Sequence, residues 1–389
     1  MEKNFEMLAK TFYGMESLLA DELLSLGAQD IKKGNRLVHF KGDKGFMYKA
    51  NLCLRTALKI LKPFYHFKAN NEHELYEKIY NFDWNELLSP NETFLIDSVV
   101  FGQIFTHSLY ASQRTKDAIV DRIRKQTGDR PNVDTRHPDF RIHLHIYENE
   151  CSISLDSSGS SLHHRGYRSA TNIAPMNEVL AACLVQLSGW DRQTDFIDPM
   201  CGSGTILIEA AMLACDIPAN LNRNEFAFEK WSDWDASLFD KIRQSQLKKV
   251  KSPVGKIYGF DKAPSAVEKA IQNVKNASLE DFIHVNRANF FHSSKIGETP
   301  LHLLTNPPYG ERLEGDIDGL YQEFGDTLKR NYPNTNAWMI SSNFEAMKFV
   351  GLRPTRKIKL FNGKLESRLC LFPIYAGTKK IHKLKKDEN

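Results

Sequence analysis

Apolar residues in the first part of the chain recur with two different spacings. Over 14–26 and 44–61 they recur at the three- and four-residue intervals of a helix. The short apolar runs at 5–9 and 37–40 are typical of strands. We therefore predict a small α+β unit with one antiparallel sheet over residues 1–64.

Residues 65–160 mix helical and strand-like patterns in the same way. Over 112–124 the apolar positions fall on one side of a predicted helix, and Arg114 and Lys116 fall on the other. The serine-rich stretch 156–161 predicts a domain boundary. The remaining predicted elements are a helix over 75–88 and strands over 93–100, 141–147 and 151–155.

From residue 161 to 376 the pattern changes to strand, turn and helix in regular alternation. Such alternation is typical of a doubly wound, mostly parallel sheet. The polar, tryptophan-containing stretch 222–251 interrupts it and has no chemical assignment. Predicted strands end at Asp198 and Asp261 or cover 282–285 and 301–304, and predicted helices cover 205–214 and 265–276.

The first motif with chemical meaning runs from Asp198 to Thr205 and contains Gly202 and Gly204. The two glycines remove side chains that would keep a ligand away from the backbone, and they permit a tight turn. The following helix presents free N–H groups at its start. The motif follows a strand that ends in an acid, which is the setting of a cofactor-binding loop.

Asp261 ends the next predicted strand. A carboxylate at this position can accept hydrogen bonds from both hydroxyls of a ribose. It can equally cap the next helix, with Pro264 near the helix start, and both roles are compatible. The distance from the glycine loop to Asp261 exceeds the roughly 20 residues of a dinucleotide-binding motif, which argues against a nicotinamide-dependent dehydrogenase.

The third motif, Asn306-Pro307-Pro308-Tyr309-Gly310, follows the apolar run 301–304. The nitrogen of an aromatic amine is a poor nucleophile because its lone pair is delocalised into the ring. The Asn306 side-chain oxygen and the Pro307 carbonyl are two acceptors for its hydrogens, and they would localise that lone pair. Tyr309 can stack on a base that has left its helix. The motif therefore predicts transfer to an exocyclic amino group.

Composition and charge narrow the class of protein without identifying it. The chain is 41% hydrophobic and 26% charged, which is typical of a globular protein. The longest apolar runs fall short of a membrane span, and the N-terminal residues lack a secretory signal, so we expect a cytoplasmic protein. Six scattered cysteines without a C-x-x-C pair predict neither a metal site nor disulfides. The basic tail 377–389 is either a solvated terminus or a phosphate contact.

These motifs together resemble those of THUMP-domain-containing class I RNA methyltransferases, in the branch similar to bacterial 23S rRNA (guanine-N2)-methyltransferases. The resemblance covers nearly the whole chain. It implies an α/β fold, in which a Rossmann-like class I methyltransferase domain over 161–376 follows a ferredoxin-like unit over 1–64 and a THUMP RNA-binding domain over 65–160. The motifs that carry it are Phe12 to Glu16, Leu23 to Gly27, Gln113 with Lys116 to Asp121, Arg165 to Arg168, Ala174-Pro175, Asp198 to Thr205, Asp261, Thr305 to Leu313, and the hairpin motif Phe361 to Glu366.

The resemblance also implies a cofactor, partners and site residues. The methyl donor would be S-adenosylmethionine, and the partner would be RNA, in 23S rRNA or a large-subunit assembly intermediate, with no metal and no membrane. Asn289 stands near the adenine position, where relatives often carry aspartate. The implied catalytic residues are Asn306, Pro307, Pro308 and Tyr309; the cofactor-binding residues are Asp198, Met200, Gly202, Ser203, Gly204, Asp261, Lys262 and Asn289; the RNA-binding residues are Arg114, Lys116, Arg165, Tyr167 and Arg168.

Rival functions of two classes remain open at this point. The same turn suits methylation of adenine N6 in DNA or of a glutamine amide in a protein, although neither requires a THUMP unit. An RNA-binding ribosome-assembly factor without catalysis is the alternative outside enzymes, and the intact motifs argue against it. The preference for guanine over adenine rests on the resemblance alone.

Overall fold

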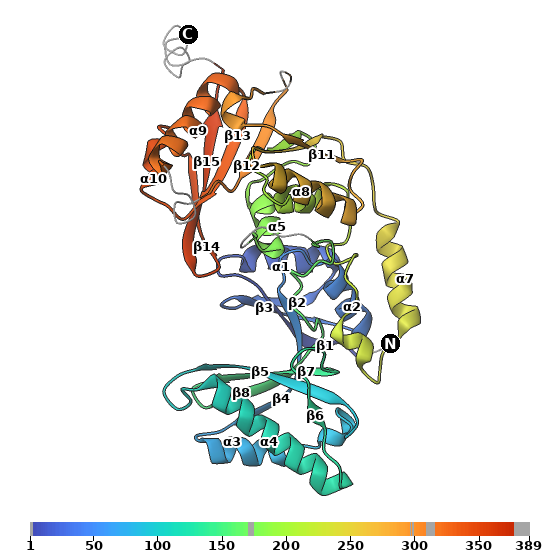
Figure 1. Cartoon of the computed structure of the whole chain (residues 1–389). Helices are drawn as coiled ribbons and strands as arrows, with labels where there is room; N and C mark the ends of the chain where they lie inside the picture. The colour runs from blue at the N-terminus through green and yellow to red at the C-terminus, as the bar shows by residue number, and fades with distance from the viewer. Residues whose placement is uncertain (1–2, 170–174, 296, 298, 309–315, 377–389) are drawn as a thin grey trace. The chain divides into compact units, whose positions relative to one another are not determined.

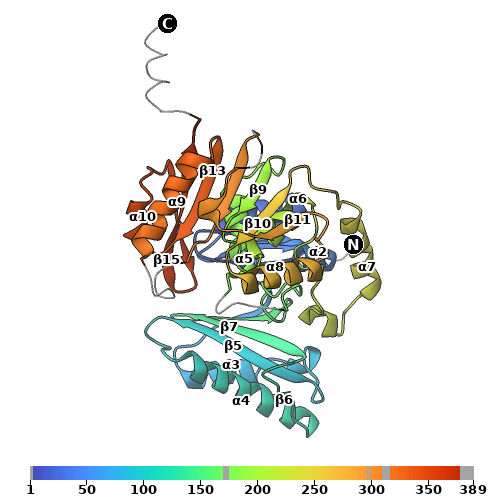
Figure 2. The same cartoon turned by 45° about the horizontal axis from the view of Figure 1, so that its top comes forward.

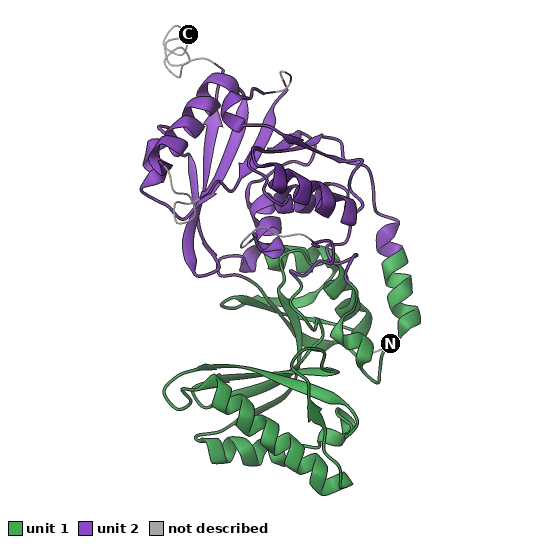
Figure 3. Ribbon diagram, viewed as in Figure 1, with its two compact units in different colours: residues 1–11, 19–162, 224–244 green, residues 12–18, 163–223, 245–389 purple. Residues whose placement is uncertain are grey.

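The computed structural model describes the whole chain except residues 1–2, 170–174, 296, 298, 309–315 and 377–389. The chain forms two compact units, coloured separately in Figure 3. Unit 1 comprises residues 1–11, 19–162 and 224–244, and unit 2 comprises residues 12–18, 163–223 and 245–389.

Unit 1 is built on an eight-stranded sheet in the order β2-β3-β1-β4-β8-β7-β5-β6 (Figure 1). The N-terminal strands pair antiparallel, as predicted, whereas β5 runs parallel to β7. The strands are β1 (Phe5–Lys10), β2 (Gln29–Lys33), β3 (Leu37–Gly42), β4 (Lys59–Lys68), β5 (Thr93–Phe101), β6 (Asn132–Val133), β7 (Phe140–Tyr147) and β8 (Glu150–Asp156).

Strand β4 joins the two halves of this sheet. It pairs with β1 through Leu8 and Leu61, and with β8 through Leu61 and Asp156. The helix expected over 44–61 is therefore too long, because α2 (Lys44–Cys53) ends before the chain enters β4. The expected division between residues 64 and 65 lies inside this continuous strand.

Four α-helices in the N-terminal 160 residues cover the sheet of unit 1. The predicted helix over 14–26 is α1 (Glu16–Leu26), and the predicted helix over 112–124 is the longer α4 (Ser108–Thr127), which ends at Gly128 with a φ of 85°. Alongside α4 lies α3 (Glu72–Tyr80) (Figure 1), which is followed by the 3-10 turn η1 (Trp84–Glu86).

The serine-rich stretch that was expected to be a linker is buried in unit 1. Ser157 and Ser158 are fully enclosed. The Ser158 hydroxyl donates to the Asn51 side-chain oxygen at 2.7 Å, and it accepts from the Ile60 backbone N–H at 2.9 Å. These contacts satisfy polar groups that would be costly to bury alone. The unit boundary follows at residues 162/163.

The insertion that lacked an assignment contributes to the core of unit 1. Residues 224–244 contain η2 (Ala227–Lys230) and most of α7 (Ala236–Leu247). Phe228 stacks on Tyr48 with ring centroids 4.5 Å apart, and Trp234 contacts the same tyrosine edge-on at 5.1 Å. The insertion is therefore a strap on unit 1 whose aromatic residues pack in the core, although most of its other residues are polar.

Unit 2 is the predicted doubly wound sheet, in the order β11-β10-β9-β12-β13-β15-β14 (Figure 2). The five neighbouring strands β11, β10, β9, β12 and β13 run parallel, and the hairpin of β15 and β14 is added antiparallel to β13. The strands are β9 (Asp195–Asp198), β10 (Ile257–Asp261), β11 (Ile283–Arg287), β12 (Leu301–Thr305), β13 (Thr335–Ser341), β14 (Arg356–Asn362) and β15 (Leu365–Ile374); the helices are α5 (Glu178–Leu187), α6 (Thr205–Ala214), α8 (Pro264–Asn276), α9 (Ile317–Asn331) and α10 (Ala346–Phe349), with the 3-10 turn η3 (Phe290–His292).

This strand order determines where a ligand can bind. Strand β10, which follows β9 in sequence, lies on one side of β9 in the sheet. Strand β12, which comes later in the chain, lies on the other side of β9. At such a reversal the connections after neighbouring strands diverge, and they leave a crevice at the carboxyl ends of the strands. Asp198, Asp261 and Thr305 are the last residues of the three strands at this reversal.

Candidate active site

A cavity of about 1090 Å³ opens at these strand ends, and all of its lining residues belong to unit 2. Ten of the predicted site residues line it together, although they are spread over more than a hundred positions of sequence. They are Asp198, Met200, Gly202, Ser203, Asp261, Lys262, Asn289, Asn306, Pro307 and Pro308.

The glycine loop forms the tight turn that the sequence predicts. Gly202 and Gly204 have φ values of 55° and 81°, in the region that favours glycine. Gly204 is the N-cap of α6. A Cβ atom at Gly204 would lie 3.3 Å from the Ala270 side chain of α8, so this glycine permits close helix packing and does not line the cavity.

The Asp261 carboxylate accepts hydrogen bonds from two backbone N–H groups, one in the glycine loop after β9 and one just after its own strand β10. Its Oδ2 accepts from the Gly202 N–H at 3.0 Å, and its Oδ1 accepts from the Ala263 N–H at 2.9 Å. Asp261 therefore ties the glycine loop to β10, in addition to facing the cavity. Asn289 also serves the backbone, because its side chain accepts from the Phe291 N–H at 3.2 Å and caps η3.

Asp198 is a buried carboxylate, 1% exposed, at the centre of the site. Its Oδ1 accepts from the Thr305 hydroxyl at 2.8 Å and from the Met200 N–H at 3.2 Å. Burial raises the pKa of Asp198 to about 7, although these two hydrogen bonds lower it in part. Thr305 thereby connects the cofactor loop to the strand that leads into Asn306.

The remaining wall of the cavity comes from segments further along the chain. Residues 342–345, after β13, line it together with the segment 306–308. The β14–β15 hairpin contributes Asn362, Gly363, Leu365 and Glu366. The cavity therefore has one end at the glycine loop and another between the proline turn and the hairpin. Tyr309 lies outside the described residues.

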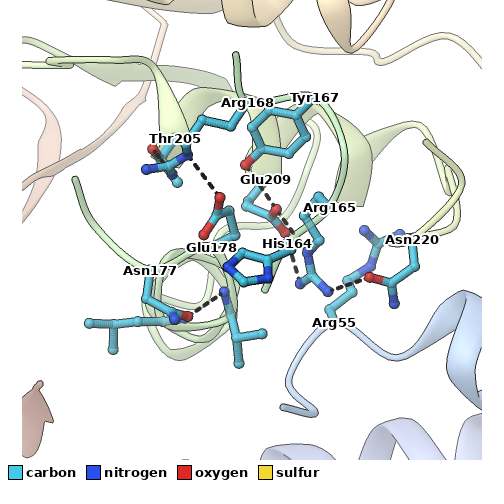
Figure 4. Close-up of polar contacts among 12 residues, drawn as sticks. Arg55, His164, Arg165, Tyr167, Arg168, Asn177, Glu178, Thr205, Glu209 and Asn220 are labelled. Atoms are coloured by element: carbon cyan, nitrogen blue, oxygen red, sulfur yellow. Dashed lines mark hydrogen bonds and ion pairs between the residues drawn. The ribbon is translucent and has the colours of Figure 1, made fainter. Parts of the chain in front are cut away.

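The structure corrects the expected role of Arg165 and Tyr167. Both side chains are 1% exposed, so they do not present themselves to RNA. Arg165 instead pairs with Glu209 of α6 at 3.3 Å and donates to Asn220 at 3.1 Å, and the Tyr167 hydroxyl donates to Glu209 at 3.2 Å (Figure 4). Because buried charges require partners, this network anchors the segment before the cofactor loop.

Arg168 extends this buried network toward the cavity. Its guanidinium pairs with Glu178 at 2.8 Å and donates to the Thr205 hydroxyl at 2.8 Å (Figure 4). It also donates to the carbonyl of Met176, which lines the cavity. Burial raises the pKa of Glu178 to about 7, and the adjacent arginine opposes that rise. Arg168 is thus a positioning residue for the cavity wall and not a surface cation.

Arg114 and Lys116 lie on α4 of unit 1. The Arg114 guanidinium lies over the Tyr76 ring at 4.6 Å, and Lys116 pairs with Asp117 at 2.8 Å. The half-exposed lysine is compatible with a phosphate contact. For both residues a contact with RNA stays a prediction.

Sequence reasoning missed the carboxylates of this network, although a signal was present. Glu178 is the first residue of the apolar helix α5 and Glu209 lies inside the apolar helix α6, and both are almost fully buried. A carboxylate in such a helix needs a cation opposite it, and Arg165 and Arg168 were available. Missed as well were Pro175, Met176 and the hairpin residues, whose approach to the cavity depends on long-range packing.

The part of the chain that the structure describes contains neither a metal-binding cluster nor a helix that could span a membrane. No group of three or more His, Cys, Asp or Glu side chains is arranged to hold a metal ion there. Among those same residues, no helix combines the length and apolar character needed to cross a membrane.

The glycine loop and the Asn306–Pro308 segment share one cavity at the reversal of a Rossmann-like sheet, which is the arrangement of a methyltransferase domain. Comparison with known families gives the particular one. The model described as RMKL-like, methyltransferase domain, matches residues 165–370, the THUMP domain model matches 69–156, and the RlmL ferredoxin-like domain model matches 6–61. The chain belongs to the RMKL-like methyltransferases, and the predicted resemblance is confirmed.

Individual relatives agree with this assignment. The ribosomal RNA large subunit methyltransferase K/L of Methylococcus capsulatus is 38% identical over 371 residues, which cover 93% of this chain and 50% of that protein. An RNA methyltransferase of Synechocystis is 34% identical over 365 residues, covering 93% and 95% of the two chains. The crystal structure of SMU.472, a methyltransferase complexed with SAH, has a TM-score of 0.86 at 30% identity, covering 97% of this chain and 100% of that one. The chain spans about half the length of the K/L relatives.

Proposed function

We propose that this protein transfers a methyl group from S-adenosylmethionine to the N2 atom of a guanosine in 23S rRNA, in the cytoplasm, on free rRNA or on an assembling large subunit. The observation that carries the proposal is the single cavity shared by the glycine loop, Asp261 and the Asn306–Pro308 turn. One end of that cavity suits the donor, and the other suits an amino group on an aromatic base.

The donor end has the charge that S-adenosylmethionine requires. The donor supplies a methyl group on a positively charged sulfur. Asp198 and Asp261 bring two carboxylates to this end, and among the described residues Asp198 is hydrogen-bonded to neutral groups, the Thr305 hydroxyl and the Met200 N–H. Asp198, Met200, Gly202 and Ser203 would hold the methionine part, Asp261 the ribose, and Lys262 and Asn289 the region of the adenine.

The acceptor end has the chemistry for activating an amine. The Asn306 side-chain oxygen and the Pro307 carbonyl would accept the two hydrogens of the guanine amino group, so that its lone pair turns toward the donor. Neither proline has an N–H that competes for those acceptors. In this proposal Tyr309 stacks on the flipped base.

Unit 1 would bring the RNA to the enzyme. The match to the THUMP domain supports this assignment, as do the cations of α4. Arg114 and Lys116 would contact phosphates, which orient an RNA without reading its sequence.

The direct test combines purified protein, labelled S-adenosylmethionine and RNA from cells that lack this gene, followed by nucleoside analysis. N2-methylguanosine in 23S rRNA is the expected product. Label in another nucleoside or another RNA would contradict the branch assignment. Label only in DNA or protein acceptors would move the function to the rival amino-methyltransferases, and donor binding without transfer would favour the assembly factor.

The variant Asn306→Ala tests the mechanism in the same assay. Because it removes one of the two acceptors for the amine, we expect at least a hundredfold loss of transfer, while the dissociation constant for the donor changes by less than about threefold. An equal loss of transfer and donor binding would show that Asn306 serves the cofactor or the fold instead.

A further inference from the structure

The β14–β15 hairpin closes the acceptor end of the cavity with residues that the proposed mechanism does not use. The sequence motif Phe361 to Glu366 spans its turn, and Asn362, Gly363, Leu365 and Glu366 line the cavity. The ring of Phe361 packs edge-on against Tyr13, also in unit 2, with centroids 5.8 Å apart. This contact supports the hairpin from the side, so its turn is held at the cavity.

Glu366 presents a carboxylate at this end of the cavity. Its Oε2 pairs with Lys359 of the neighbouring strand at 2.7 Å. Among the described residues this is the only polar partner of its side chain, so Oε1 remains available to a ligand. The side chain is 37% exposed. The other carboxylate on this wall, Glu345, is 80% exposed and already bound to Lys348, and it is therefore the weaker candidate.

An aromatic ring lies on the same wall. Phe344 lines the cavity, and the guanidinium of Arg368 covers one side of its ring at 4.2 Å. A guanidinium behind an aromatic face fixes the ring and makes it a firm support for a flat ligand. This wall of the cavity therefore combines a carboxylate acceptor with an aromatic surface, which is the combination that recognises a base through its edge and its face.

We propose that Glu366 selects guanine at the acceptor site by accepting a hydrogen bond from its N1–H. This inference rests on the proposed function and deepens it, because it names the residue that distinguishes guanine from adenine. Lys359 holds the carboxylate through Oε2 and leaves Oε1 directed to the base. Glu366 thereby acts on substrate specificity, whereas Asn306 and Pro307 act on the amino group.

The edges of the two purines explain the selectivity. The Watson–Crick edge of guanine presents N1–H next to the amino group on C2, and both are donors. Adenine presents an amino group next to an unprotonated N1, which is an acceptor. A carboxylate that faces N1 gains a charge-assisted hydrogen bond with guanine, and it meets a lone pair with adenine. The discrimination expected from one such contact is about tenfold to a hundredfold.

The test uses a synthetic RNA that carries the mapped target nucleotide as guanosine or as 2-aminopurine. The analogue keeps the amino group that receives the methyl but has an acceptor at N1. The wild-type protein should favour guanosine by at least about tenfold in kcat/KM. In Glu366→Gln the amide can donate to that N1, so this preference should shrink by about tenfold, while the dissociation constant for S-adenosylmethionine stays unchanged.

A purely structural role for Glu366 would lower kcat/KM for both RNAs equally and leave their ratio intact, and that result would overturn the inference. Glu345→Gln is the matched control, since it neutralises the other carboxylate of this wall and should leave the ratio at its wild-type value. Transfer to guanosine by the wild-type protein is measured in the same series. Its absence would reject the proposed function itself, and is thus distinguishable from failure of the Glu366 assignment.

Discussion

Two basic segments of this chain have the same appearance in the sequence and opposite surroundings in the structure. Arg114 and Lys116 lie on the amphipathic helix α4, where the lysine pairs with its neighbour Asp117 and is half-exposed. Arg165 and Arg168 lie before the cofactor loop, and their guanidinium groups are enclosed with Glu209 and Glu178 (Figure 4). Both pairs had been predicted to contact RNA.

The difference lies in the carboxylates that face each pair. A cation on an amphipathic helix has solvent around it, and its ion pairs contribute little to stability. A cation opposite an acid in an apolar helix is enclosed, because neither charge can be buried without the other. Charge clusters therefore predict an RNA-binding surface only after their acidic partners have been sought.

The largest effect is expected from removing the buried cation Arg165. Arg165→Met leaves Glu209 enclosed without its partner, which should lower the free energy of unfolding by about 3–5 kcal/mol. Urea denaturation measures the change. The double variant Arg165→Met with Glu209→Gln should recover part of the loss. If Arg165→Met kept its stability and lost only RNA binding, Arg165 would be an RNA contact at the surface and not a buried structural cation.

Asp198 extends the comparison to a buried carboxyl group that has no adjacent cation among the described residues. Because burial raises the pKa of Asp198 to about 7, well above the ordinary value of an aspartate, the folded protein retains a proton between about pH 4 and 7 that the unfolded chain has released. The free energy of unfolding should therefore fall as pH rises through this window, by up to about 1.4 kcal/mol per pH unit.

Unfolding of the donor-free protein at several pH values measures this slope. Glu178, whose pKa is also raised, acts in the same direction. In Asp198→Asn the slope should become shallower, and an unchanged slope would mean that Asp198 is ionised throughout the window.

The smallest effect on stability is expected from the two partly buried cations of α4. Arg114→Ala with Lys116→Ala should change the free energy of unfolding by about 1 kcal/mol or less, since it removes one cation–π contact and one surface ion pair. If both cations contact phosphates, the slope of log binding constant against log salt concentration should fall by roughly 1.5. Filter binding at several salt concentrations tests this. An unchanged salt slope would remove α4 from the RNA surface.

Most elements of the fold could be predicted from local patterns. The spacing of apolar residues over 14–26 and 112–124 indicated helices that the structure contains, because one face of each helix must be buried. The helix predicted over 44–61 was too long, since the strand propensity of residues 59–61 is decided by their pairing with β1 and β8. The strap 224–244 could not be predicted, because its aromatic residues pack against Tyr48, which is distant in sequence.

The candidate site was predicted at its strand ends and missed at its far wall. Asp198, Asp261 and Asn306 each follow an apolar run, so their position at one edge of a parallel sheet follows from sequence and the rules of chain topology. No comparable rule leads to Phe344 or Glu366, which reach the cavity through the antiparallel addition of β15 to β13.

By itself the sequence determined the strand–helix rhythm, the chemistry of the strand ends and the family to which the chain belongs. These features depend on residue type and on neighbours in the sequence, so they can be recognised without knowledge of the tertiary structure. The tertiary structure was needed to show which charges are enclosed, which aromatic residues form the core, and which carboxylates line the cavity. Burial and pairing depend on residues brought together from distant parts of the chain, and the free energy of a charge depends on that environment more than on its own identity.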